Sequence, residues 1–219
     1  ARTQASLRGG VTWAPHSGTG FASAYLVAGD AGGRAYAVDP ATGAVAWEVT
    51  LPGAEAVQAL PVEQMWDYSG PSYRARYGPT VTDLVFFVSR NASTTTNRIY
   101  ALRLADGALL WQFNATGGVA LDGGVGVPVV DMARSRLYVP TRAGAAGTQP
   151  SLWTLSTLDG SLVGSLALGH VEAALGVSWD WNTLYVGATS GTLYAVDLTG
   201  AAPTVRWSYA LGGALVART

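Results

Sequence analysis

A short segment that is repeated four times limits the folds open to this sequence. Each copy is an alternating apolar stretch, a tight turn that contains glycine, and a second apolar stretch, which is typical of a β-hairpin. The copies begin at Tyr36, Tyr100, Trp153 and Tyr194. Another pair of apolar stretches precedes each hairpin, which predicts units of four antiparallel strands about 40 to 60 residues long.

Four such units predict an all-β protein, a β-propeller of four blades with four antiparallel strands each. A sheet with two apolar faces cannot bury both alone, whereas radial stacking of several sheets does. In the second unit we expect the first strand at 78–83. We interpret the sequence as one propeller domain or sector. Its blades are expected at 9–52, 78–117, 123–169 and 173–211, with an insertion at 53–77 and a strand of a fifth blade at 212–218.

Large aromatic residues recur at one position of the repeat, near the start of the last strand. Trp47, Trp111 and Trp207 occupy it in the first, second and fourth units, and the third unit has Gly164 instead. A tryptophan ring is large enough to fill the wedge between neighbouring blades. We therefore predict that these tryptophans pack blade against blade.

The first copy, Ala37-Val-Asp-Pro-Ala-Thr-Gly-Ala-Val-Ala-Trp47, resembles the PQQ repeat of quinoprotein-like propellers. The second and fourth copies match this pattern in part, and the resemblance covers nearly the whole chain. It implies a propeller, which in this family usually has seven or eight blades. We therefore expect a sector of a larger propeller, with a half-propeller that dimerises as the second alternative and a closed four-bladed ring as the third.

The predicted insertion is rich in aromatic residues and arginine, the composition of interface hot spots. We expect it to connect the last strand of one blade to the first of the next, either as a contact surface or as a lid over its neighbour. The residues that would form the contact are Trp66, Tyr68, Tyr73, Arg74, Arg76 and Tyr77.

Two N-glycosylation sequons begin at Asn91 and Asn114. Asn91 belongs to a Ser/Thr-rich loop between the second and third strands, so we expect it to be exposed. Asn114 follows the last strand of the same unit. The alternation of strand directions predicts that both lie on the face that carries the insertion.

Charge and composition argue against several classes of function. The formal net charge is −1 and the 13 basic residues are scattered, so no basic stripe indicates nucleic-acid binding. The chain has no cysteine, and its two histidines lack partners at metal-ligand spacing. No apolar run reaches the ~18 residues of a membrane-spanning helix. We predict no catalytic residues, cofactor, metal site or membrane-spanning segment.

These features together favour a non-catalytic propeller module outside the cytoplasm, whether extracellular, at the cell surface or periplasmic. It would mediate protein–protein contacts or structural assembly, with a protein partner or by self-association, and would carry N-glycans. The resemblance also implies an alternative, part of a quinoprotein dehydrogenase dependent on PQQ and Ca²⁺. Against that alternative, the sequence has no vicinal cysteine pair. It also has no cluster of acidic and amide residues that can be matched to a Ca²⁺ site of such enzymes.

Overall fold

The turns of the repeated hairpins show why these segments fold as they do. In the computed structural model, Gly43, Gly107 and Gly160 have φ angles of 71°, 72° and 73°, in the left-handed region that glycine adopts without strain. Each glycine N–H donates to the carbonyl four residues earlier, as Gly43 does to Asp39 at 2.8 Å. The structure describes residues 5–19, 22–78, 80–93, 96–114, 121–123, 126–144 and 147–215.

The strands form four sheets of four, and within each sheet neighbouring strands are antiparallel and follow chain order. The first sheet contains β1 (Leu7–Pro15), β2 (Ala24–Asp30), β3 (Arg34–Val38) and β4 (Val45–Thr50). The second contains β5 (Val62–Gln64), β6 (Leu84–Val88), β7 (Ile99–Arg103) and β8 (Leu109–Phe113).

The other two sheets repeat this arrangement. The third contains β9 (Val129–Asp131), β10 (Arg136–Pro140), β11 (Leu152–Ser156) and β12 (Leu162–Leu166). The fourth contains β13 (Gly176–Val177), β14 (Thr183–Gly187), β15 (Thr192–Asp197) and β16 (Thr204–Ala210). The described helices are the 3-10 helix η1 (Trp66–Tyr68) and α1 (Pro71–Tyr77). The predicted all-β, propeller-like fold is confirmed.

The second sheet differs from expectation in its first strand. Residues 78–83 are not a strand in the part of the chain that the structure describes, and β5, inside the predicted insertion, takes that place. Val62 pairs with Phe86 and Gln64 with Leu84. Asp83, directly before β6, accepts hydrogen bonds from the backbone N–H groups of Ser17 and Trp66, so polar contacts with two connections hold this segment in place of strand pairing.

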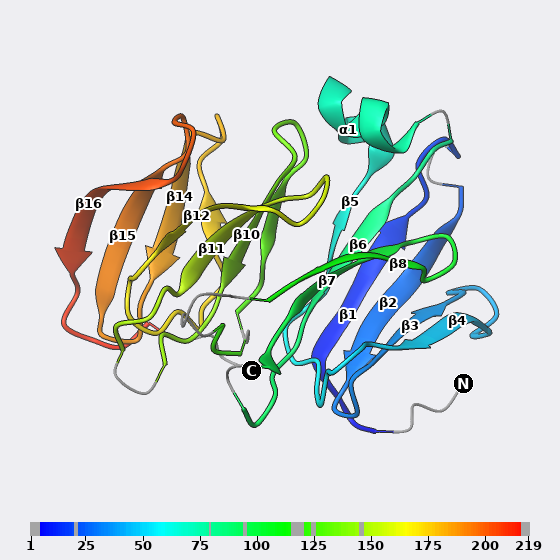
Figure 1. Cartoon of the computed structure of the whole chain (residues 1–219), viewed down its shortest axis with the longest axis horizontal. Coiled ribbons are helices and arrows are strands. Elements are labelled where there is room, and N and C mark those ends of the chain that lie inside the picture. The colour runs from blue at the N-terminus through cyan, green and yellow to red at the C-terminus, as the bar shows by residue number, and fades with distance from the viewer. Residues whose placement is uncertain are drawn as a thin grey trace.

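The four sheets stand side by side in chain order, from β1–β4 on one side of Figure 1 to β14–β16 on the other. Alternate residues of a central strand face different neighbours, as the fully buried β6 illustrates. Val85 and Phe87 pack in a cluster with the first sheet, whereas Phe86 and Val88 pack with the third. The core therefore consists of layers between successive sheets, and a strand buried on both faces is apolar throughout.

Two of the three repeated tryptophans lie in these layers. Trp47 is 7% exposed and its Nε1 donates to the Leu104 carbonyl of the second sheet at 2.7 Å. Trp111 is 9% exposed and donates to the Thr157 carbonyl of the third sheet at 3.1 Å. Trp207 differs, because it is 44% exposed on β16, a strand exposed along its whole length.

The C-terminal segment was expected to supply a strand of a fifth blade. Residues 212–215 are not in a strand, and 216–218 lie outside the described residues. In the described part of the chain, no helix is both long and apolar enough to cross a membrane.

Candidate binding groove

The aromatic segment predicted as an insertion lies between β5 and β6, which are the first and second strands of their sheet. It therefore belongs to the face that carries the other first-to-second strand connections, where α1 projects in Figure 1. We call this the α1 face. The expected place, on the opposite face with the connections between sheets, was wrong because β5 was not recognised as a strand.

Two carboxylates, one buried and one exposed, fix this segment to the first sheet. Asp83, 7% exposed, accepts hydrogen bonds from the backbone N–H of Trp66 and of Ser17, both at 2.7 Å. Asp67 accepts a further bond from the Gly18 N–H at 2.7 Å. Since Ser17 and Gly18 belong to the β1–β2 connection, the start of the β5–β6 connection is held in one position.

Half of the predicted contact residues serve packing. Tyr73 is fully buried in the core between the second and third sheets, and its hydroxyl donates to the Thr82 carbonyl at 3.2 Å. Burial raises the pKa of this hydroxyl far above its usual range. Trp66 and Tyr77 are half-buried against the same core, and the Tyr77 hydroxyl donates to Leu158 of the third sheet at 2.6 Å.

The other predicted contact residues, Tyr68, Arg74 and Arg76, are exposed. The Arg74 guanidinium lies 4.9 Å from the centre of the Trp66 ring and donates to the Asp67 carbonyl at 2.6 Å. Tyr68 is 56% exposed and borders a groove on the α1 face. The inner side of the segment thus covers the sheets, and its outer side is exposed to solvent.

Three successive first-to-second strand connections form the walls of this groove. They come from the second, third and fourth sheets, and the space between them is about 620 Å³. We name it the methionine groove, and it is lined by Met65, Tyr68, Val130, Asp131, Met132, Ala133, Arg134, Asp180 and Trp181.

Arg134 holds two walls of the methionine groove together. Its guanidinium pairs with Asp131 at 2.8 Å, donates to the Trp181 carbonyl at 2.7 Å, and reaches Asn182 Oδ1 at 2.9 Å. Asp131 is itself 2% exposed. The charge of Arg134 is therefore already compensated at the groove floor, and the β9–β10 and β13–β14 turns keep a fixed spacing.

The third wall is held through backbone contacts with the β9–β10 turn. The Gly70 N–H donates to the Met132 carbonyl at 3.2 Å. A side chain at Gly70 would collide with the Ala133 carbonyl, so glycine is required for this close approach. The groove is consequently preformed.

The chemistry of the methionine groove suits apolar side chains of a partner. Both methionines of the chain line it, and methionine adapts its shape to varied apolar surfaces. Trp181, 39% exposed, and Tyr68 provide aromatic rims of the kind that anchor interfaces. Hydrogen bonds, from the Ser178 side chain above all, lower the pKa of the Asp180 carboxyl, which keeps a negative charge at one end.

Sequence reasoning missed most of this groove. Met65 lay inside the predicted contact segment, but Met132, Arg134 and Trp181 are far from it in the sequence. The one available signal was that the chain has only two methionines. Within the residues that the structure describes, no group of three or more His, Asp or Glu side chains could hold a metal ion.

The sequons lie on the face opposite to the α1 face, because Asn91 is in the β6–β7 connection and Asn114 follows β8. The expectation that they share a face with the aromatic segment was wrong. Asn91 was also expected to be exposed, but it is 7% exposed. Its Oδ1 accepts from the Glu55 N–H at 2.8 Å, and its Nδ2 donates to the Gly53 carbonyl at 2.7 Å. Asn114 is exposed, and its glycosylation stays a prediction.

Comparison with known proteins adds one match. The family model described as outer membrane protein assembly factor BamB matches residues 3–150 and 63–218. These overlapping matches include all four sheets. No curated protein matches the chain. The predicted resemblance to PQQ-repeat propellers is confirmed, and the chain belongs to the family of BamB-like PQQ-repeat proteins.

Proposed function

We propose that this chain is a non-catalytic propeller module that binds a protein partner through the methionine groove. The partner would present an extended segment with apolar side chains, and the module would act in an assembly outside the cytoplasm. The observation that carries the proposal is the groove itself, about 620 Å³ in volume, with two methionines and two aromatic rims on a preformed frame.

The family match supports the same function. The matching family is described by its role in outer membrane protein assembly, which is a task of protein recognition. We extend that role to this chain as part of the proposal, together with a periplasmic or cell-surface location. The exposed position of Tyr68, next to the fixed β5–β6 connection, gives a partner an aromatic contact at the groove entrance.

The proposal is tested by selecting peptides that bind the chain from a displayed library of unstructured sequences. Dissociation constants of the selected peptides are then measured with the Trp181→Ala and Met132→Ala variants. We expect each variant to weaken binding about tenfold or more, equivalent to about 1.4 kcal/mol, since both remove apolar contact area inside the groove.

Trp13→Ala is the matched control, because Trp13 is 57% exposed on β1 and does not line the groove. Binding to this variant should equal that of the unchanged chain. The groove is not the binding site if the selected peptides bind all three variants with unchanged affinity while circular dichroism shows intact folds.

A further inference from the structure

Two of the three layers between sheets are closed by an indole ring in the same way. The Trp47 Nε1 donates to the Leu104 carbonyl, and its ring lies so close to Gly107 that an added Cβ there would be 2.8 Å from Trp47 Cε3. Trp111 repeats both contacts in the next layer, with the Thr157 carbonyl and with Gly160. An indole thus rests on the turn glycine of the following sheet.

The third layer has no tryptophan at this position. Trp47 pairs with Ala37 across its sheet and Trp111 pairs with Ala101, whereas the residue paired with Thr154 is Gly164. The fourth sheet nevertheless has a turn at the receiving position, although Gly200 in it does not have the positive φ of Gly107 and Gly160. Counted from the hairpin start, Leu198 corresponds to Leu104 and Thr157, the residues whose carbonyls accept the indole N–H.

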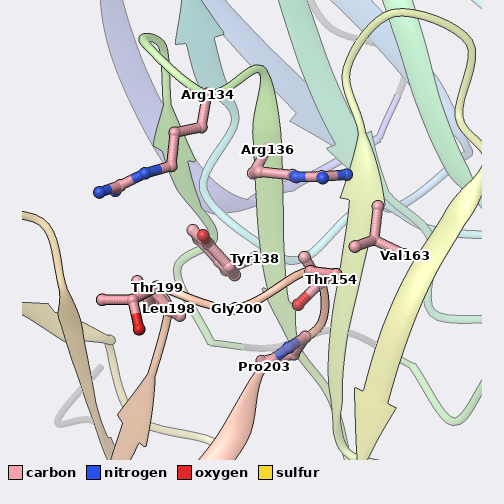
Figure 2. Close-up of a pocket in the computed structure, with 10 residues that line it drawn as sticks. Arg134, Arg136, Tyr138, Thr154, Val163, Leu198, Thr199, Gly200 and Pro203 are labelled. Atoms are coloured by element: carbon pink, nitrogen blue, oxygen red, sulfur yellow. The ribbon is translucent and has the colours of Figure 1, made fainter.

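A cavity of about 190 Å³ lies in this layer, between the third sheet and the turn of the fourth (Figure 2). Its walls include Tyr138, Thr154, Val163, Leu198 and Pro203. Tyr138 pairs with Thr154 across the sheet, as Phe86 pairs with Ala101 beside the Trp111 ring. The cavity therefore lies next to the position at which the first two layers hold an indole, and cavities of about 150 Å³ can accept a benzene-sized ligand.

The cavity also contains a buried hydroxyl group that can accept or donate a further hydrogen bond. Thr154 is 2% exposed, and its buried Oγ1 has no hydrogen-bond partner among the described residues. In Figure 2 the Arg136 side chain extends along one wall toward Val163. A guanidinium beside an aromatic face gains a cation–π interaction, and a buried hydroxyl without a partner gains from a ligand that bonds it.

Pro203 fills part of the space between the two sheets but leaves a cavity beside it. A Cβ on Gly164 would lie 3.0 Å from Pro203 Cδ, so the space directly over Gly164 is already filled. The remaining cavity is bounded by Thr154 and Tyr138 on one side and by the turn at 198–203 on the other. Its exposed edge at Thr199 and Gly200 opens it to solvent.

We propose that this cavity binds an indole ring, either as a free small molecule or as the tryptophan side chain of a partner. The ring occupies the layer that lacks its own tryptophan, with its N–H directed at the turn of the fourth sheet or at Thr154. This site shares the Arg134 side chain with the methionine groove, but its other lining residues differ and it does not depend on the function proposed for that groove.

The test is a titration of the isotopically labelled 219-residue chain with indole, followed by NMR. We expect saturable shifts at Thr154, Leu198 and Gly200. Thr154→Leu adds volume inside the cavity and should weaken indole binding about tenfold or more. The matched Thr154→Val keeps the shape and replaces the hydroxyl with a methyl group, so indole binding should change less in this variant than in Thr154→Leu.

A second arm uses N-acetyltryptophanamide in place of indole. Binding of indole alone supports a small-molecule site, and binding of both probes supports a site that also takes a tryptophan side chain. The proposal is overturned if neither probe shifts the cavity resonances at millimolar concentration, or if Thr154→Leu and Thr154→Val bind indole as the unchanged chain does. If Thr154→Leu fails to fold, saturable shifts confined to the cavity residues of the unchanged chain still support the proposal, and their absence overturns it.

Discussion

At the scale of single residues, Glu63 on β5 carries an unusual charge state. Its Oε1 is buried and has no hydrogen-bond partner among the described residues. Burial, reinforced by the nearby Asp83 carboxylate, raises the pKa of Glu63 to about 9. The folded protein therefore holds this carboxyl protonated at neutral pH, whereas the unfolded chain releases the proton near its usual pKa.

This difference makes stability fall as pH rises, because the unfolded state binds fewer protons than the folded state between about pH 4.5 and about pH 9. Glu63→Gln keeps a neutral side chain of the same shape and should remove that slope. We expect the variant to gain up to about 3 kcal/mol relative to the unchanged chain between pH 5 and pH 7. Urea unfolding at a series of pH values measures it, and equal slopes in both proteins would contradict it.

The residue scale is also where prediction from sequence was least complete. Asn91 was predicted to be an exposed sequon, yet its amide ties the β6–β7 connection to residues 53–55. The sequence gives the amide and the nearby polar residues, but it does not say whether the partner is water, a glycan or the backbone of a distant loop. Tyr73 shows the same limit, since an aromatic residue suits an interface and a core equally well.

At the scale of the elements, we expect the repeated tryptophan to contribute differently to the free energy of unfolding in different sheets. Trp111 on β8 fills the layer between the second and third sheets, whereas Trp207 on β16 is half-exposed beside Tyr185. Trp111→Ala is expected to cost about 3–5 kcal/mol because it leaves a cavity and removes a buried hydrogen bond to the Thr157 carbonyl. Trp207→Ala at the equivalent repeat position should cost about 1 kcal/mol or less. Chemical denaturation of both variants measures this difference, and equal losses would show that β16 is covered in solution.

The strands themselves were predicted well where two local signals coincide. The hairpins β3–β4, β7–β8 and β11–β12 have alternating apolar residues on both sides of a glycine turn, and each formed. β5 was missed because three residues with one buried polar side chain give no period to recognise. Its identity depends on pairing with β6, which is a contact between distant segments.

At the scale of the whole molecule, the layers between sheets are unequal. The first two contain an indole and its hydrogen bond, whereas the third contains Gly164 and a cavity of about 190 Å³. Stacked repeats contact mainly their neighbours, so local stability follows the quality of each layer. The fourth sheet has the cavity on one side and the exposed β16 on the other.

We therefore expect the fourth sheet to open before the second. Native-state hydrogen exchange should give lower opening free energies for amides of β14 and β15 than for those of β6 and β7. Amides of the first two layers should exchange close to the limit of global unfolding. A uniform opening free energy across all four sheets would mean that the layers unfold as one unit.

The number of sheets, the hairpin turns and the family could be predicted without a structure, because they follow from local periods and from glycine at fixed repeat positions. The two proposed binding sites could be located only from contacts between segments that are distant in the sequence. The methionine groove joins connections from three sheets, and the cavity near Gly164 depends on what the next sheet places opposite it. The physical reason is that a repeat specifies its own hydrogen bonds, whereas the space between repeats depends on side chains that are distant in sequence.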